Sequence, residues 1–199
     1  MDTGLLLPLA VFALTLAVSP GGATTLATSS GAQFGFRRSI TLMVGISAGL
    51  AALAAIAGAG LSGLLMAVPS LQLAMKVIGT AYLLRLAWKI GNSGPPNLLA
   101  NMTNPLGFAA GVVLLWVNPK AWAMVTGAAA AFAGLTSHPV ELAAVLGIAF
   151  GLAAAVSQSI WCVAGILLAK LLKTERQWRA VNTTLGVLLA ASTIPIWLT

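Results

Sequence analysis

Long apolar runs separated by short polar connections dominate the chain and predict six membrane-spanning helices. The runs cover about residues 4–27, 39–61, 71–91, 106–133, 140–168 and 179–198. Each run is long enough to cross the hydrocarbon core of a bilayer, about 30 Å, at the rise of an α-helix. The short connections leave no room for a soluble domain, so we expect one all-α polytopic transmembrane domain over residues 1–199.

The first apolar run is interrupted by a segment that cannot continue an α-helix. Leu5 to Val18 is almost entirely apolar, and Ser19-Pro20-Gly21-Gly22 follows before small and apolar residues resume. Proline lacks an N–H and clashes with the preceding turn, and the two glycines free the backbone further. We therefore predict that the first helix is broken at Pro20.

The fourth run contains a matching interruption about half the chain length later. There the proline of Asn118-Pro119-Lys120 again divides a long apolar segment, and a polar residue again precedes it. The fourth helix is therefore predicted to be broken at Pro119. Two matched breaks, one in each half, indicate a transporter made of two repeats with its binding site between them.

Composition and charge support this class and indicate how the chain is oriented. Hydrophobic residues make up 59% of the sequence and charged residues 7%, which excludes an ordinary soluble domain. The net charge is +7, and every Lys and Arg except Lys76 and Lys120 falls at an odd-numbered connection. By the positive-inside rule those connections are cytoplasmic, so both termini are predicted to face outward. The charge thus indicates topology, and no nucleic-acid partner is expected.

The two halves of the chain are predicted to form a 3+3 inverted-topology repeat. The first repeat covers about residues 1–91, a central loop about 92–105, and the second repeat about 106–199. Three spans per half is an odd number, so the second half inserts upside down relative to the first. Glycine pairs at Gly45/Gly49 and Gly147/Gly151 occupy equivalent places, although a chain rich in glycine and alanine also contains such pairs by chance.

Topology does not explain Lys76 and Lys120. A cation within the hydrocarbon is costly and usually lines a cavity or meets a partner. For Lys76, near the outer end of the third span, the alternative is snorkelling to the interface. For Lys120, on the second break, the alternative is that its side chain caps carbonyl groups freed by Pro119.

These features predict a substrate site between the two breaks. Broken helices expose N–H groups that attract a carboxylate, and a lysine adds a charge-assisted contact. Amide and hydroxyl side chains beside the breaks supply further partners. The predicted substrate-binding residues are Pro20, Gly21, Gly22, Thr24, Thr25, Lys76, Asn118, Pro119 and Lys120.

Other polar residues within the spans more often bond to neighbouring helices than to a ligand. They are Ser47, Gln158, Ser159, Asn182 and Thr183. No carboxylate lies within a predicted span, so a proton-coupled mechanism leaves a buried lysine as the carrier. Coupling to protons or to another ion therefore stays open, and so does assembly into a homo-oligomer.

The sequence lacks the groups that an enzyme or a metal site needs. The single cysteine, Cys162, lies in an apolar stretch and has no partner for a disulfide or a dithiol. The single histidine, His138, has no Cys, Asp or second His beside it. We therefore expect no catalytic residue, no metal and no cofactor.

Taken together, the motifs of the chain resemble those of the lysine exporter (LysE/RhtB) family of bacterial amino-acid efflux proteins. They are Ser19-Pro20-Gly21, Gly31, Gly35-Phe36-Arg37, Gly45-x-x-x-Gly49, Lys76-x-x-Gly79-x-x-Tyr82-Leu83 and Asn118-Pro119-Lys120-Ala121. The end of the third span, Leu86 to Ile90, looks like the cysteine/O-acetylserine exporter branch. One departure is Gly22, which stands where the family commonly has a second proline.

The resemblance implies a secondary transporter of the bacterial inner membrane that exports small amino acids or their derivatives by alternating access. Its partners would be the small amino-acid substrate and the lipid bilayer. Two other classes stay open at this point. One is a membrane interaction subunit that does not itself transport, and the other is a passive channel.

Overall fold

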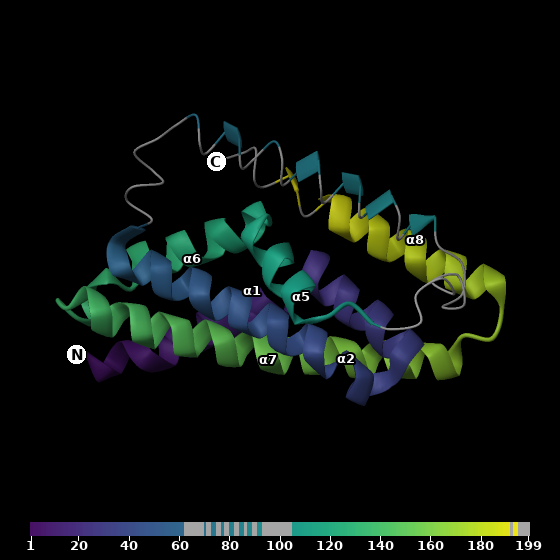
Figure 1. Ribbon diagram of the computed structural model, residues 1–199, viewed down its shortest axis with the longest axis horizontal. Coiled ribbons are helices and arrows are strands. Elements are labelled where there is room, and N and C mark those ends of the chain that lie inside the picture. The colour runs from purple at the N-terminus through teal and green to yellow at the C-terminus, as the bar shows by residue number, and fades with distance from the viewer. Residues whose placement is uncertain are drawn as a thin grey trace.

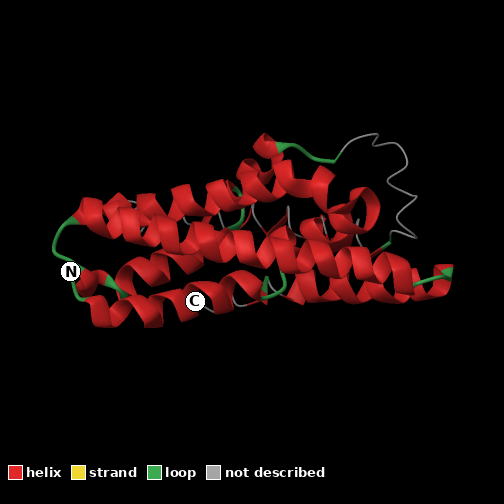
Figure 2. Ribbon diagram, turned by 90° about the horizontal axis from the view of Figure 1, so that it is seen from below, coloured by secondary structure: helices red, strands yellow, loops and turns green. Residues whose placement is uncertain are grey.

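The structure, a computed structural model, consists of helices and short connections, with no strand in the part of the chain that it describes (Figures 1 and 2). The described residues are 1–61, 70, 73–74, 77, 80–81, 84–85, 87–88, 91–92, 105–191 and 193–194. Much of the predicted third span, most of the predicted central loop and the last residues of the predicted sixth span therefore lie outside the described residues. A helical membrane protein fits what is described.

The helices at 108–131 and 139–171 follow the predicted apolar runs closely, whereas the first two runs are joined into one helical segment. A 3₁₀ turn at Thr3–Leu5 leads into α1, and a π-helical turn at Ala57–Leu61 extends α2. A second 3₁₀ turn, Ala133–Leu135, precedes α7. The helices themselves are α1 (Leu6–Val18), α2 (Gly22–Ile56), α5 (Phe108–Trp116), α6 (Pro119–Ala131), α7 (Pro139–Leu171) and α8 (Glu175–Ala191).

The chain leaves the helical conformation at both proline segments. α1 ends at Val18, and α2 begins only after Gly21, whose backbone is fully extended. α5 ends at Trp116, and α6 begins at Pro119 with its axis bent by 68° from that of α5. That these segments lie in the middle of a bilayer stays a prediction, as does the 3+3 inverted repeat.

α2 folds back on itself at Gly35. The Ser30 and Ser39 hydroxyl oxygens lie 2.7 Å apart, whereas nine residues of straight helix would separate their positions by about 13.5 Å. Gly35 has a φ of 75°, a conformation that glycine adopts without steric cost. The sequence predicted a connection between about residues 27 and 39. The helix instead continues on both sides of Gly35, because one glycine with positive φ is enough to turn the chain.

Small residues bring α2 and α7 into close contact along their length. Gly147 and Gly151 of α7 pack against Ala51 of α2, and Gly58 packs against Ala143. Both helices run along the long axis of the molecule, as Figure 1 shows. Large side chains of both helices belong to the hydrophobic core and are almost fully buried, among them Leu42, Ile46, Leu53, Leu146 and Phe150.

The other glycine pair of the sequence serves a different contact. A Cβ at Gly45 would overlap the Phe108 carbonyl group of α5, and one at Gly49 would press on Val112. Gly111 of α5 lies equally close to the backbone at Leu42 of α2. Glycines on both helices thus allow α5 to lie against the second arm of α2.

By length and composition alone, two described helical segments could cross a membrane: Gly22–Gly60, which folds back at Gly35, and Pro139–Leu171. The bent pair of α5 and α6 adds a third if it is one broken span. Residues Thr3–Val18 form a shorter apolar helix. The predicted count of six spans therefore stays a prediction.

The tightest helix contact gives a stability prediction. A Cβ at Gly165 of α7 would overlap the Thr28 carbonyl oxygen, so Gly165→Ala should destabilise the protein by about 1–3 kcal/mol through overpacking. Gly127→Ala is the matched control, because no neighbouring atom lies within 4 Å of its Cβ. Thermal unfolding of the detergent-solubilised variants measures both. Equal stability of the two variants would show that the α2–α7 contact is looser than described.

Candidate functional site

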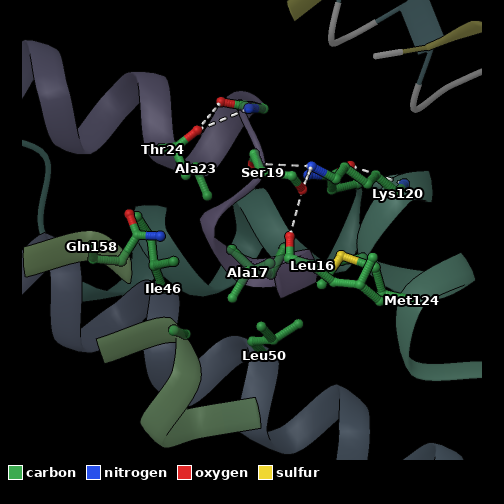
Figure 3. Close-up of a pocket in the computed structure, with 16 residues that line it drawn as sticks. Leu16, Ala17, Ser19, Ala23, Thr24, Ile46, Leu50, Lys120, Met124 and Gln158 are labelled. Atoms are coloured by element: carbon green, nitrogen blue, oxygen red, sulfur yellow. Dashed lines mark hydrogen bonds between the residues drawn. The ribbon is translucent and has the colours of Figure 1, made fainter. Parts of the chain in front are cut away.

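A pocket lies where the end of α1 meets the beginnings of α2 and α6 (Figure 3). The pocket is open on one side, and its volume of about 420 Å³ includes solvent at the mouth. The break segments supply most of its polar wall, and apolar side chains supply the rest. The lining residues are Leu16, Ala17, Ser19, Gly21, Gly22, Ala23, Thr24, Ile46, Leu50, Leu115, Asn118, Lys120, Ala121, Met124, Ala154 and Gln158.

The break after α1 frees carbonyl groups that would otherwise bond within the helix. Carbonyl groups at a helix C-terminus lack an intrahelical donor, and Pro20 has no N–H to offer. Two donors from α7 take their place. The Ser157 hydroxyl donates to the Ala17 carbonyl oxygen at 2.7 Å, and the Trp161 indole N–H donates to the Val18 carbonyl oxygen at 3.0 Å.

Lys120 serves the next two carbonyl groups. Its Nζ donates to the Ser19 carbonyl oxygen at 3.2 Å, to the Ser19 Oγ at 2.8 Å and to the Pro20 carbonyl oxygen at 3.1 Å (Figure 3). A lysine ammonium has three N–H donors, so these three oxygens match its capacity. The negative end of the α1 dipole favours the cation further. Lys120 therefore caps the carbonyl groups of the first break, rather than those freed by Pro119.

The beginning of α6 holds Lys120 in position for this contact. The Asn118 Oδ1 accepts from the Lys120 backbone N–H at 3.0 Å, and Pro119 occupies the first turn, where its missing N–H costs nothing. Asn118 is buried, so the cap is fixed by its surroundings. The second break is thus ordered locally, and the lysine side chain reaches from it to the first break.

Two tryptophans brace the bend between α5 and α6. The Trp122 indole N–H donates to the Trp116 carbonyl oxygen at 2.8 Å, which satisfies one carbonyl group at the end of α5. The two rings meet edge to face, with their centroids 6.2 Å apart. Neither tryptophan lines the pocket, so their role here is to fix the bend.

The beginning of α2 presents backbone amides to the pocket. The Thr24 hydroxyl accepts from the Gly21 N–H at 2.8 Å and donates to the Gly21 carbonyl oxygen at 2.9 Å. The N–H groups of Gly22, Ala23 and Thr24 have no earlier helical carbonyl to bond, because they belong to the first turn. All three residues line the pocket, so the positive end of a helix dipole faces it.

Gln158 of α7 adds a polar group that nothing in the described part of the chain satisfies. The residue is 2% exposed, and its Oε1 is buried without a hydrogen-bond partner. It lies across the pocket from Lys120 in Figure 3. A buried acceptor without a donor costs about 1–3 kcal/mol, so this oxygen is suited to a donor that arrives with a ligand.

The structure brings most of the predicted site residues together. Gly21, Gly22, Thr24, Asn118 and Lys120 line the pocket, and their role in binding stays a prediction. Three further predicted residues lie beside the pocket without lining it: Pro20, whose carbonyl group bonds Lys120; Thr25, whose hydroxyl bonds the Gly21 carbonyl group; and Pro119, which is buried. Lys76 lies outside the described residues.

Sequence reasoning gave too little weight to four residues. The sequence pattern marks Ser19 only as part of the break, and it assigns no role to Ser157 or Trp161. Gln158 belongs by pattern to the polar residues that usually bond other helices. A usable signal exists for the pair on α7, because Ser157 and Gln158 are adjacent polar residues within an apolar helix. Their burial and their partners depend on the packing of α7 against α1, which the sequence pattern does not contain.

The described lining of the pocket carries a single positive charge and no negative charge. Lys120 is the one formally charged residue among the lining side chains that the structure describes, and no carboxylate lines the pocket. Across the described residues, no group of three metal-ligating side chains is present. The first residues of α2 and the Ser19 carbonyl group, at the end of α1, both border the pocket, so helix ends of opposite polarity meet there.

Comparison with known proteins places the chain among translocators. Residues 14–194 match the family described as LysE type translocator. A "Cysteine/O-acetylserine efflux protein" of Klebsiella pneumoniae subsp. pneumoniae is 32% identical over 80% of this chain and 81% of its own length. Proteins of the same name from Escherichia coli O1:K1 / APEC and strain K12 are 30% and 29% identical, each over 94% of both chains. No solved structure matches the chain.

The donors on α7 give a prediction for this site. Ser157→Ala leaves the Ala17 carbonyl group without its donor and should destabilise the protein by about 1–3 kcal/mol. Ser159→Ala is the control, because its hydroxyl bonds only Ala155 of its own helix. The melting temperature of each purified variant measures the difference. An unchanged melting temperature for Ser157→Ala would mean that water replaces the serine at the end of α1.

Proposed function

Because the chain belongs to the LysE type translocator family, we propose that it exports small amino acids or close derivatives across the bacterial inner membrane. It is a translocator-family protein and not an enzyme. The observation that carries the proposal is the pocket between the two breaks, which places opposite ends of half-helices around one small space.

The pocket favours a zwitterion over a simple cation or anion. The first amides of α2, at Gly22 to Thr24, offer a positive pole to a carboxylate. The carbonyl groups at Ser19 and Pro20 offer a negative pole to an ammonium group. An α-amino acid carries these two groups on adjacent atoms and can therefore meet both poles at once.

The walls favour a small substrate. Gly21, Gly22 and Ala23 line the pocket with almost no side-chain volume, and Ile46 and Leu50 form an apolar part of the lining. Gln158 adds one acceptor without a partner. This combination suits an amino acid with a short side chain. The efflux proteins that resemble the chain are named for cysteine and O-acetylserine, which are small.

Transport would follow from movement of one repeat against the other around this pocket. In the predicted 3+3 arrangement both termini face outward, helices one and four break in mid-bilayer, and rocking of the repeats exposes the pocket to each side in turn. The residues that we assign to the site are Pro20, Gly21, Gly22, Thr24, Thr25, Lys76, Asn118, Pro119 and Lys120. No carboxylate lines the described pocket, so the coupling ion is left open, as is a homo-oligomer.

Counterflow in proteoliposomes tests the proposed function directly. We expect small amino acids such as cysteine, serine and alanine to compete for counterflow. Analogues that lack either charge, an alkylamine or a carboxylic acid of the same size, should compete roughly 10- to 100-fold more weakly, because each lacks one charge-assisted contact. Protein-free liposomes are the control.

The alternatives give different results in the same experiment. A passive channel produces a leak that does not saturate with substrate concentration. A membrane subunit without transport of its own produces no flux for any compound in the panel. Saturable counterflow of decarboxylated amines with the affinity of the parent amino acid would contradict the zwitterion site while leaving a carrier in place.

The two glutamines with unpartnered oxygens provide a matched pair for the site. The Oε1 atoms of Gln158 and Gln33 are both buried without a partner, and only Gln158 lines the pocket. Gln158→Leu should therefore raise the half-saturating amino-acid concentration about 10-fold without loss of stability, whereas Gln33→Leu should leave it unchanged. Concentration-dependent counterflow measures both. Equal effects of the two substitutions would remove Gln158 from the site.

A further inference from the structure

We infer that the oxygens around the Lys120 Nζ form a binding subsite for a primary ammonium group, and that Lys120 occupies this subsite as an internal substitute for the ammonium of the substrate. The subsite consists of the Ser19 carbonyl oxygen, the Ser19 Oγ and the Pro20 carbonyl oxygen. The inference rests on the proposed function for the identity of the natural ligand, and on the described contacts for the subsite itself.

The geometry of these oxygens fits an ammonium group. All three lie 2.8–3.2 Å from the Nζ, within the range of N–H···O hydrogen bonds. Three acceptors match the three N–H donors of R–NH₃⁺, and the end of the α1 dipole adds a negative potential. The α-ammonium of an amino acid presents the same three donors as the side chain that is now in place.

Lys120 can leave its acceptors more easily than the two α7 side chains that donate to the same end of α1. Ser157 is fully buried, and its short side chain on α7 fixes the bond to Ala17. Trp161 is a rigid ring that holds Val18. Lys120 is instead half-buried, lines the pocket and reaches the oxygens on a flexible four-carbon chain. The carbonyl groups of Ser19, which lines the pocket, and of Pro20 beside it are therefore satisfied by a long side chain that can move.

Lys120 satisfies the hydrogen-bond acceptors of the subsite when no substrate is bound. Without Lys120, no other described group donates to the carbonyl oxygens of Ser19 and Pro20, and at the predicted mid-membrane position that is costly. The lysine donor comes from the opposite break, about half the chain length away, so the same bonds join the two halves while no substrate is present. An amino acid that brings its own ammonium group replaces these bonds and releases the lysine.

Refilling the subsite with a small amine tests this inference without any transport measurement. Lys120→Met removes the ammonium group and keeps the length of the side chain. We expect methylammonium at a saturating concentration to raise the melting temperature of the purified Lys120→Met protein by about 2–4 °C. The wild-type protein, whose subsite is filled, should show no such rise. Lys170→Met, at the exposed end of α7, is the matched control and should behave like the wild type.

Two other cations separate an ammonium subsite from general ionic effects. Tetramethylammonium has the same charge without an N–H donor, and sodium is a cation without directional donors. Neither should stabilise Lys120→Met. Stabilisation by either of them equal to that by methylammonium would overturn the assignment, because it would show that charge alone is recognised.

A second variant covers the case in which Lys120→Met does not fold. Lys120→Gln also removes the ammonium group and retains a polar side chain, and it should show the same rise with methylammonium. If methylammonium stabilises neither Lys120→Met nor Lys120→Gln, the inference is overturned. That failure would leave the proposed export function standing, since counterflow measures it independently. If the wild-type protein shows no counterflow while methylammonium still stabilises the Lys120 variants, the ammonium site stands and the export function is rejected.

Discussion

The structure depends on how the carbonyl groups at the end of α1 are satisfied. A helix that ends within a protein surrounded by lipid exposes backbone oxygens where water is scarce, and each unsatisfied group costs several kcal/mol. Here four consecutive carbonyl groups, from Ala17 to Pro20, each accept a hydrogen bond from a side chain of the second half of the chain. The first break is therefore stable only because the second half is folded against it, and the pocket exists only where the two halves meet.

Glycine contacts determine where those donors lie. Ser157 and Trp161 reach α1 because α7 packs closely on both arms of α2, with Gly151 against Ala51 on one arm and Gly165 against Thr28 on the other. The turn at Gly35 places these two arms side by side. A side chain at any of these contacts would push α7 away and lengthen the hydrogen bonds to the end of α1. The small residues thus act on the pocket through the positions of the donors, although none of the glycines in these contacts lines it.

Much of this arrangement could be predicted from the sequence, and the missing parts have a common cause. The apolar runs predicted α5, α6 and α7 closely, because their ends carry strong local signals such as Pro119 and Pro139. The resemblance to the lysine exporter family is likewise confirmed. The partner of Lys120 was not predicted, because the local alternative, a cap on the second break, has the same sequence signal as a contact with the first. The roles of Gln158 and Ser157 cannot be predicted for the same reason, because their surroundings are set by the packing of α7 against helices distant in the sequence.

The position of Lys120 also explains why one half of the chain is not enough to make the site. The first break alone provides the amides at the start of α2, which attract an anion, and the carbonyl groups at the end of α1, which attract a cation. The break segment itself contains no cation that can donate to the carbonyl oxygens of Ser19 and Pro20 when the pocket is empty. The second break supplies that cation from a capped helix start, where Asn118 fixes the backbone and the long Lys120 side chain reaches the two carbonyl groups. In the proposed transport cycle, release of the ligand leaves these oxygens without a donor, and a side chain from the opposite half can refill them.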